Sequence, residues 1–422
     1  MYYLANAFMD AGYKVTVFSV ANKVNQTFGN PINFNAKALP IEKHFYKSFV
    51  DSKMQQRTSS ASTGAKSQAS LVGKMRATIK QNKFVFNAMD STDKFFFNEP
   101  SFLMGPITRN WCKTHADGIN QYIKDNPVEA VIISGPPFGM FSIAKYVKEK
   151  NKQIPIVLDY RDPWNLWHKK SQYALSLESH NFEYADKVVF TNHNLEQDMC
   201  KKFPAISGKT DVVMNGYSSD AWSGVKSSES KKHDQLMITY TGSVDIVETS
   251  KLGFRDVTVL FDALEKAVDK GCKIKLVFVG AANPNTPYAE EQKKRLGNHL
   301  EIEGMVSNTE AMKRMMESDA LLILHTVTDA SSKYLVGGKL YDYIRAGKYV
   351  LSIGDPDGLN SRTVADENIG SYCENTVDGI YNVLIDMYRK WTQKTLVPNK
   401  VDVEKYSREY QNRHYVDIVQ NL

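Results

Sequence analysis

In the second half of the chain, short apolar runs alternate with helical patterns. The runs LMITY (236–240) and ALLILH (320–325) have the length of buried strands, and residues 257, 260, 261 and 264 form an apolar stripe at helical spacing between them. A strand without polar alternation must be covered on both faces, as in a parallel sheet flanked by helices. Right-handed crossovers then give a doubly wound α/β fold. The other strands predicted in this half are 273–279, 300–303 and 349–353.

The same alternation of strand and helix patterns also occurs in the first half of the chain, between residues 111 and 214. Strands are predicted at 130–134, 154–159, 184–190 and 211–214, with helices between them. A chain of 422 residues is long for one core, so two domains of about 200 residues each are expected. Residues 218–235 have linker composition. The predicted domains are therefore residues 1–225 and 226–400, followed by a helical segment at 401–422.

The net charge of +6 is modest for this length, and its clearest concentration lies between residues 41 and 83, where Lys and Arg far outnumber Glu42 and Asp51. A solvated, flexible basic insertion at about 50–83 is one interpretation. The alternative is peripheral contact with an anionic membrane that carries a lipid-linked acceptor, with Phe95, Phe96 and Phe97 nearby. No recognition motif accompanies these charges, which argues against nucleic-acid binding.

The cysteines favour a reducing, cytoplasmic compartment, because they are few, far apart and without CxxC spacing. This spacing also argues against structural zinc, and no metal site is predicted. The sequence contains no apolar run of the length that spans a bilayer and no signal-peptide pattern at its start. A cytoplasmic protein, at most attached to the inner face of the membrane, is expected.

The stretch SSKYLVGGKLYDYIRAGKYVLSI (331–353) combines several features of a phosphate site. Gly337 and Gly338 open a short helix, which Gly347 ends. Lys339 and Asp342 are three residues apart, so they should project together from the first turn. Free amides, the helix dipole and a lysine suit a diphosphate, and a carboxylate suits sugar hydroxyls. An ordinary turn and cap remains the alternative. Leu340, Tyr343 and Ile344 are the predicted buried side.

Several motifs occur in an order that is characteristic of one family. They are SGPP (134–137), DYRDPW (159–164), NGY (215–217), YTGS (240–243) and KLYDYIRAGKYVL (339–351). Together they resemble family-4-like glycosyltransferases of bacterial surface polysaccharide biosynthesis, which have the GT-B architecture. The resemblance covers most of the chain. It implies two Rossmann-like domains that face each other across a cleft, with the C-terminal helix crossing back to the first domain.

The resemblance also implies a donor site in the second domain, for a nucleotide-diphosphate sugar with UDP or GDP. Lys339 and the first turn of its helix would hold the diphosphate, with Arg255 as a second cation. Asp342 would contact the ribose, although Tyr334 stands where the family usually has a partner glutamate. Met305 and Val306 would face the base or belong to the core. The full predicted donor set is Gly242, Ser243, Arg255, Met305, Val306, Gly337, Gly338, Lys339, Leu340 and Asp342.

Candidate catalytic residues follow the predicted strand 154–159. Asp159, Arg161 and Asp162 could form an internal ion-paired turn, or Asp162, assisted by Arg161, could act on an acceptor hydroxyl. With Lys339 and Arg255 stabilising the leaving group, a metal-independent transfer to a glycan or lipid-linked acceptor is expected. The resemblance implies that the transfer retains the anomeric configuration of the sugar. His115, His168 and His325 lie near strand ends or loops, where surface or structural roles are expected for them.

The start of the chain departs from the doubly wound pattern. Residues 1–9 form a predicted helix and residues 14–20 a predicted strand, whereas such a domain normally opens with a strand and a glycine-bearing loop. A fragment or a misplaced start would explain this, and it puts full activity in doubt. Two other functions therefore remain open: a sugar-nucleotide 2-epimerase of the same fold and a non-catalytic donor-binding subunit.

Overall fold

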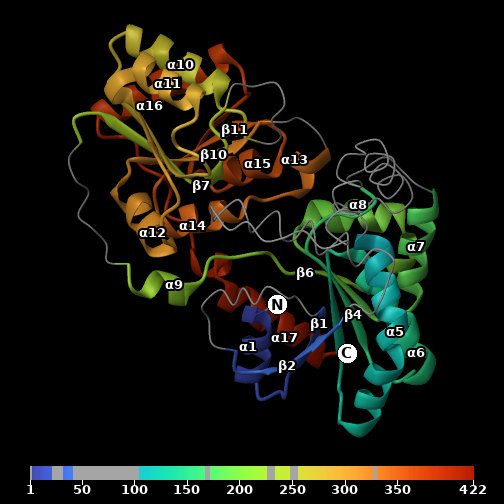
Figure 1. The fold of residues 1–422 in the computed structure, drawn as a ribbon. Coiled ribbons are helices and arrows are strands. Elements are labelled where there is room, and N and C mark those ends of the chain that lie inside the picture. The colour runs from blue at the N-terminus through green and yellow to red at the C-terminus, as the bar shows by residue number, and fades with distance from the viewer. Residues whose placement is uncertain are drawn as a thin grey trace, which may run out of the picture. The chain divides into compact units, whose positions relative to one another are not determined.

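A computed structural model describes residues 2–20, 32–40, 104–166, 172–225, 233–247, 255–326 and 330–422. The chain forms two compact units (Figure 1): unit 1 contains Met1–Val213 and His414–Leu422, and unit 2 contains Met214–Arg413. The sequence predicted the boundary between the two domains near residue 225. The basic insertion at 50–83, and with it the membrane hypothesis, lies outside the described residues, as does His168. Within the described ranges, no helix is long and apolar enough to cross a bilayer.

The described residues of unit 1 form two parallel sheets, one with the order β1-β2 and one with the order β3-β4-β5-β6. The strands are β1 (Thr16–Val20), β2 (Asn35–Leu39), β3 (Val131–Gly135), β4 (Ile156–Tyr160), β5 (Lys187–Phe190) and β6 (Thr210–Val212). The helices are α1 (Tyr2–Asp10), α5 (Met104–Asp125), η1 (Phe138–Ser142), α6 (Ile143–Lys150), α7 (Gln172–Glu183), α8 (His193–Lys202) and η2 (Pro204–Ile206).

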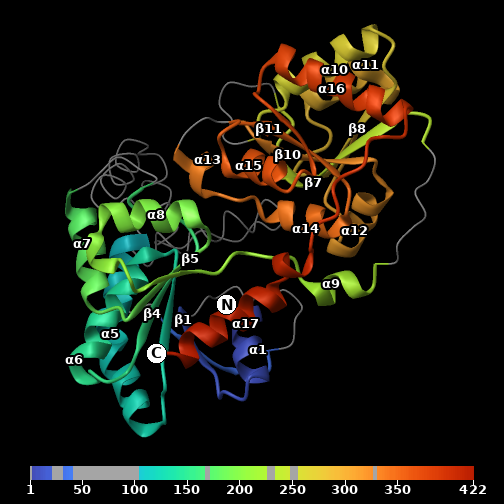
Figure 2. The same ribbon diagram turned by 180° about the vertical axis from the view of Figure 1, so that it is seen from behind.

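Helices at the two ends of the sequence pack together in unit 1. The helix α17 (Arg408–Gln420) lies beside α1 in Figures 1 and 2, and the rings of Phe8 and Tyr415 are 6.3 Å apart. Their apolar residues share a core cluster with Val157 of β4 and Val189 of β5. The β4 sequence, IVLDY, is buried at all five positions because helices cover it.

In unit 2, the residues that the structure describes form a parallel six-stranded sheet with the order β12-β11-β10-β7-β8-β9. The strands are β7 (Leu236–Val244), β8 (Ile274–Ala281), β9 (Leu300–Glu303), β10 (Ala320–His325), β11 (Tyr349–Gly354) and β12 (Gly370–Cys373). The helices are α9 (Ser219–Ser223), α10 (Thr258–Asp269), α11 (Pro287–Leu296), η3 (Gly297–His299), α12 (Asn308–Glu317), α13 (Ala330–Tyr334), α14 (Gly338–Ala346), α15 (Leu359–Asp366), α16 (Val377–Thr392) and η4 (Glu404–Tyr406).

The parallel α/β architecture confirms the sequence prediction, with local differences. The strand predicted at 236–240 is longer than expected: residues 241–243 also belong to β7, which continues to Val244 through an irregular register. The expected linker at 218–235 includes α9, whose N-cap Ser218 accepts a hydrogen bond from the Ala221 amide. The stripe at 257, 260, 261 and 264 is fully buried, as expected. The α-helices and strands that the sequence did not predict are β2, α7, α9, α11, α13, α15 and β12.

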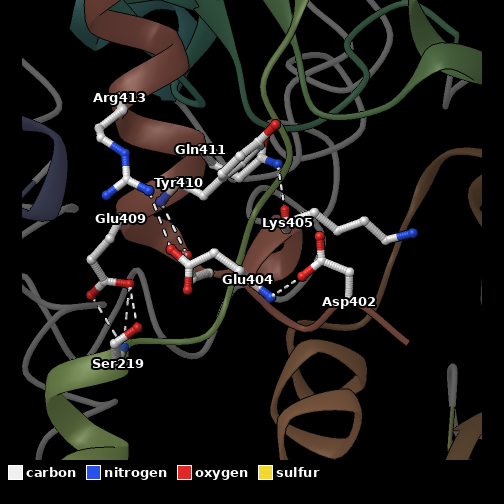
Figure 3. A network of polar contacts seen from close by, with 9 residues as sticks. Ser219, Asp402, Glu404, Lys405, Glu409, Tyr410, Gln411 and Arg413 are labelled. Atoms are coloured by element: carbon white, nitrogen blue, oxygen red, sulfur yellow. Dashed lines mark hydrogen bonds and ion pairs between the residues drawn. The ribbon is translucent and has the colours of Figure 1, made fainter. Parts of the chain in front are cut away.

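The chain enters and leaves unit 2 through paired segments. The Tyr217 amide donates to the Tyr406 carbonyl over 3.0 Å, and the Arg408 Nε donates to the Gly216 carbonyl over 2.7 Å. A Cβ on residue 216 would lie 2.6 Å from the Tyr406 carbonyl oxygen, so the NGY motif needs its glycine for this close approach. Figure 3 shows the adjoining polar contacts, in which Glu409 accepts from the Ser219 amide and hydroxyl.

Candidate functional site

The strand order places a topological switch point between β7 and β10. From β7 the chain proceeds outward through β8 and β9 on one side, and through β10, β11 and β12 on the other. Connections on the two sides diverge at this point, and in open α/β sheets ligands bind outside the carboxyl ends of the strands beside such a point. The end of β7 carries Gly242 and Ser243, and the end of β10 carries His325. This edge of the sheet is the ligand-binding position in open α/β folds.

Lys339 reaches this edge from the first turn of α14. Its Nζ donates to the hydroxyl of Tyr240 over 3.0 Å and lies 4.8 Å from the centre of the Tyr240 ring. The side chain passes directly over Gly242, because a Cβ there would lie 2.3 Å from the Lys339 Cε. Gly242 also has a φ of +108°, which favours glycine. Gly242 and Lys339, which both belong to the predicted donor set, are therefore in close contact in the structure.

A second cation approaches the same edge. Arg255, which is exposed, donates from Nη1 to the Ser243 carbonyl over 3.0 Å. Burial, and then the positive charge of Arg255, lower the pKa of Lys339 from 10.5 to about 8. Burial raises the pKa of Tyr240 to about 12, although Arg255 opposes this. Two cations that repel each other at a sheet edge form a site whose charge an anion would balance.

The start of α14 differs from the predicted cradle of two free glycine amides. The Gly337 amide donates to the side-chain oxygen of Asn360 in α15 over 3.0 Å, so it already has a partner. Gly338 is exposed, and a Cβ on it would meet no atom within 4 Å. The Leu340 amide bonds to the Gly337 carbonyl over 2.8 Å, and the Leu340 side chain is fully buried. Leu340 therefore serves the core, and the open position is at Gly338.

Asp342 does not project with Lys339. One of its carboxylate oxygens accepts a hydrogen bond from the Trp222 indole N–H of α9 over 3.0 Å, whereas Lys339 contacts β7. Burial raises the pKa of Asp342 above its usual value, and the Trp222 bond and Arg408 oppose this rise. Tertiary contacts with two different elements separate side chains that helical spacing alone placed together. A ribose contact would be left to the second carboxylate oxygen.

The loop after β9 carries Met305 and Val306. Met305 is 72% exposed, so the alternative that it belongs to the core is wrong. The preceding Gly304 carbonyl accepts from the Gly280 amide at the end of β8 over 3.0 Å, which ties this loop to the carboxyl edge of the sheet. The predicted donor-binding loops thus follow the same edge of the sheet as Gly242 and Lys339.

In unit 1, Asp159 and Arg161 form the internal ion pair that was one of two interpretations. Asp159 is buried in β4, where it accepts from the Ser134 hydroxyl over 2.7 Å and pairs with Arg161 over 3.3 Å. Asp162 follows in the loop after the strand. Burial raises its pKa to about 6, although Arg161 lowers it. A carboxyl group with this pKa can exchange a proton near neutrality.

Three contributors to these sites were missed at the sequence level. Tyr240 and Trp222 hold Lys339 and Asp342, and Asn360 occupies the Gly337 amide. Tyr240 belongs to the YTGS motif, so the sequence did contain a signal for it. Trp222 lies in the stretch that was predicted to be a linker, and Asn360 lies in a stretch for which no functional role was predicted. His115 bonds to the Pro40 carbonyl over 2.7 Å, as expected for a structural role. Among the described residues, no group of three His, Cys, Asp or Glu could hold a metal ion.

Comparisons with known proteins support the fold. A glycosyltransferase from Rickettsia africae ESF-5 is similar over 99% of this chain and 93% of its own, with 12% identity and a TM-score of 0.59. Anabaena HepE, solved in complex with UDP and glucose, covers 100% of this chain and 96% of its own, with 12% identity and a TM-score of 0.56. A UDP-forming α,α-trehalose-phosphate synthase from Burkholderia xenovorans covers 82% and 85%, with 10% identity and a TM-score of 0.51.

These similarities are structural, since no protein-family model and no curated protein matches the sequence. Together with the two parallel α/β units, they show the GT-B architecture, an α/β fold with two Rossmann-like domains, that the sequence predicted.

Proposed function

We propose that the protein is a glycosyltransferase that takes a sugar from a nucleotide-diphosphate donor, with the donor bound in unit 2. One observation carries the proposal: Lys339 and Arg255 meet at the carboxyl end of β7, beside the switch point with β10. A diphosphate at this position would balance two repelling cations. Anabaena HepE, a protein of similar fold, was solved with UDP and glucose, which makes a UDP-sugar the first donor to test.

The chemistry follows from charge. As the sugar leaves the donor, negative charge grows on the diphosphate, and a cation already in position stabilises that charge without reorganising. Lys339 and Arg255 supply two such cations, and the exposed Gly338 at the start of α14 adds the positive end of the helix dipole. The leaving group is thus stabilised by the protein's own residues, in a metal-independent transfer.

Asp162 is the proposed base for the acceptor hydroxyl, and Arg161 its neighbouring cation. The raised pKa of about 6 leaves Asp162 mostly ionised at neutral pH and makes it a stronger base than an ordinary carboxylate, which favours proton abstraction. The acceptor class we propose is a glycan or lipid-linked glycan of a bacterial surface polysaccharide, at the cytoplasmic face of the membrane. The sugar is transferred with retention of its anomeric configuration, so the acceptor hydroxyl attacks from the face that the diphosphate leaves. Asp342, through its second carboxylate oxygen, and the 305–306 loop would contact the nucleoside.

A thermal-shift screen against UDP-, GDP-, ADP- and dTDP-sugars tests donor binding, because a ligand that binds only the folded state raises its apparent stability. Lys339→Met should strongly reduce the shift. Lys294→Met, on the exposed face of α11, is the matched control and should retain it. No shift with any nucleotide sugar would refute the donor site.

Product analysis then separates the candidate activities. A transferase releases the nucleoside diphosphate when an acceptor is added. An epimerase changes the sugar while it remains on the nucleotide, and a donor-binding subunit does neither.

A further inference from the structure

Asp342 is held by a side chain from outside its own helix. The indole N–H of Trp222 in α9 donates to Oδ1 of Asp342 in α14 over 3.0 Å. Trp222 is only 3% exposed, and a buried indole needs an acceptor for its N–H. The acceptor here is a carboxyl group, which in its ionised form gives a stronger, charge-assisted bond. This bond fixes one carboxylate oxygen and thereby determines where the other one points.

The indole of Trp222 is itself fixed from several directions. The guanidinium of Arg345, three residues after Asp342 on α14, lies 5.6 Å from the centre of the Trp222 ring. The ring also belongs to a buried apolar cluster with residues of α12 and α14. At the start of α9, Glu409 accepts hydrogen bonds from the Ser219 amide and hydroxyl (Figure 3). All of these residues belong to unit 2, so the packing of this unit sets the position of the indole N–H.

The second carboxylate oxygen of Asp342, Oδ2, remains available to a ligand. No hydrogen bond joins it to any residue that the structure describes. Asp342 is only partly buried, whereas the neighbouring Tyr341 and Tyr343 are buried. It follows Lys339 by three residues, which is about 4.5 Å along the helix axis. A nucleotide whose diphosphate is bound at Lys339 would bring its ribose to this turn of the helix.

We propose that Trp222 is a positioning residue for ribose recognition: by holding Oδ1 of Asp342, its indole N–H directs Oδ2 toward the 2′- and 3′-hydroxyls of the donor nucleoside. This inference rests on the proposed function, because it adds a residue to the same donor site. A carboxylate oxygen accepts hydrogen bonds from hydroxyl groups. The substrate class that follows is a ribonucleotide sugar. A donor without the ribose hydroxyls is disfavoured, because it would leave the oriented carboxylate without a partner.

The charges around Asp342 give Trp222 a second effect on the same carboxyl group. Burial raises the pKa of Asp342, whereas the bond from Trp222, and then the charge of Arg408, lower it. Arg408 is held in place by its own bond from Nε to the Gly216 carbonyl over 2.7 Å. Burial also keeps the pKa of the adjacent Tyr343 well above its usual value, so this side chain is neutral. Loss of the Trp222 N–H should therefore leave Asp342 both less well oriented and harder to ionise.

Binding of UDP and of 2′,3′-dideoxy-UDP to the full chain, measured by calorimetry, tests this role. The parent protein should prefer UDP roughly tenfold, because the analogue lacks both ribose hydroxyls. Trp222→Phe should lower this preference to about threefold or less, mainly by weakening the binding of UDP. Trp391→Phe is the matched control: this tryptophan of α16 stacks on Tyr388 at 5.9 Å, and its replacement should leave the preference unchanged. Should the thermal-shift screen select GDP or ADP, that nucleotide and its dideoxy analogue are used instead.

Three further measurements separate positioning from folding. 3-Benzothienylalanine in place of Trp222 keeps the shape of the indole but has sulfur where the N–H was, so it should lose the preference although the protein folds. In an Asp342→Ala background, Trp222→Phe should have no further effect on UDP affinity, because the group on which it acts is gone. In the donor-free protein, carbon-13 NMR of labelled aspartate should show a higher pKa of Asp342 in Trp222→Phe and an unchanged one in Trp391→Phe.

The outcomes distinguish this inference from the proposed function. Full preference for UDP in Trp222→Phe or in the benzothienylalanine variant would overturn the inference. So would an equal loss of UDP affinity in the Asp342→Ala background, or a parent protein that prefers dTDP to UDP. A parent that binds UDP and its dideoxy analogue equally would also overturn it, while the donor site at Lys339 would stand. A parent that binds no nucleotide would refute the proposed function, and the inference with it.

Discussion

Donor affinity should fall as pH rises through 8, because Lys339 must be protonated to bind a diphosphate. In the donor-free protein, burial and Arg255 lower the pKa of Lys339 to about 8. A bound diphosphate favours the protonated amine and raises that pKa again, so binding takes up a proton. With a pKa of about 8, the protonated fraction falls from about 97% at pH 6.5 to about 24% at pH 8.5, a loss of about fourfold in affinity or ~0.8 kcal/mol.

Isothermal titration calorimetry with a UDP-sugar at these two pH values measures the effect. Repeating the titration in buffers of different ionisation enthalpy measures the proton uptake itself. Lys339→Arg keeps a permanent charge and should bind the donor with little pH dependence across this range. Lys339→Met should lower affinity by roughly 1.5–3 kcal/mol, the scale of a hydrogen bond to a charged group, and should also lose the pH dependence.

Lys339 should also lower the folding stability of the donor-free protein. Because its folded pKa is below the value of 10.5 in the unfolded chain, the unfolded state binds more protons between pH 8 and 10.5, and stability rises with pH over that range. Lys339→Met should therefore be more stable than the parent at pH 7. A pH dependence of donor affinity that persists in Lys339→Met would refute the assignment of the titrating group to this residue.

Three other predictions concern single positions. Gly242→Ala should lower donor affinity at least tenfold, because its Cβ would displace Lys339. Gly271→Ala is the control, because φ is +85° there and the space around a Cβ is open; it should cost only backbone strain of about 1–3 kcal/mol, measured by urea unfolding. Asp162→Asn should abolish transfer, while the donor affinity measured by calorimetry stays unchanged. The transfer rate of the parent protein should fall as pH drops through about 6, where the Asp162 carboxyl gains its proton. Full transfer by the variant would exclude Asp162 as the base. Glu178 is fully buried, and its pKa is about 7. The folded state therefore binds more protons than the unfolded state between pH 4.5 and 7, so stability should fall as pH rises over that range. Glu178→Gln should reduce this pH dependence of the unfolding free energy, measured at about pH 5 and 7, and an unaltered dependence would contradict the prediction.

Periodicity predicted most of the strands because each follows from local chemistry. The runs at 300–303 and 320–325 coincide with β9 and β10, and Gly347 ends α14 with a φ of +63°, as a glycine after a helix does. The prediction failed where tertiary contacts determine structure. Residues 241–243 remain in β7 because β8 continues beside them, although their composition is that of a turn.

The candidate site divides in the same way. The residue types that suit a diphosphate, a lysine and glycines at a helix start, are evident from the sequence, and so is the alternation that produces a parallel sheet. The sequence could not reveal that Asp342 would accept a hydrogen bond from Trp222 and so lie apart from Lys339. Nor could it reveal that the Gly337 amide would donate to the Asn360 side chain. Those partners lie on other elements, and only packing brings them close.

The sequence by itself therefore determined the class of fold and the chemical character of its loops, because spacing along the chain controls which side chains share a face. The tertiary structure alone decided that Lys339 and Arg255 share one sheet edge and that Trp222 holds Asp342. Both depend on contacts between segments far apart in the chain.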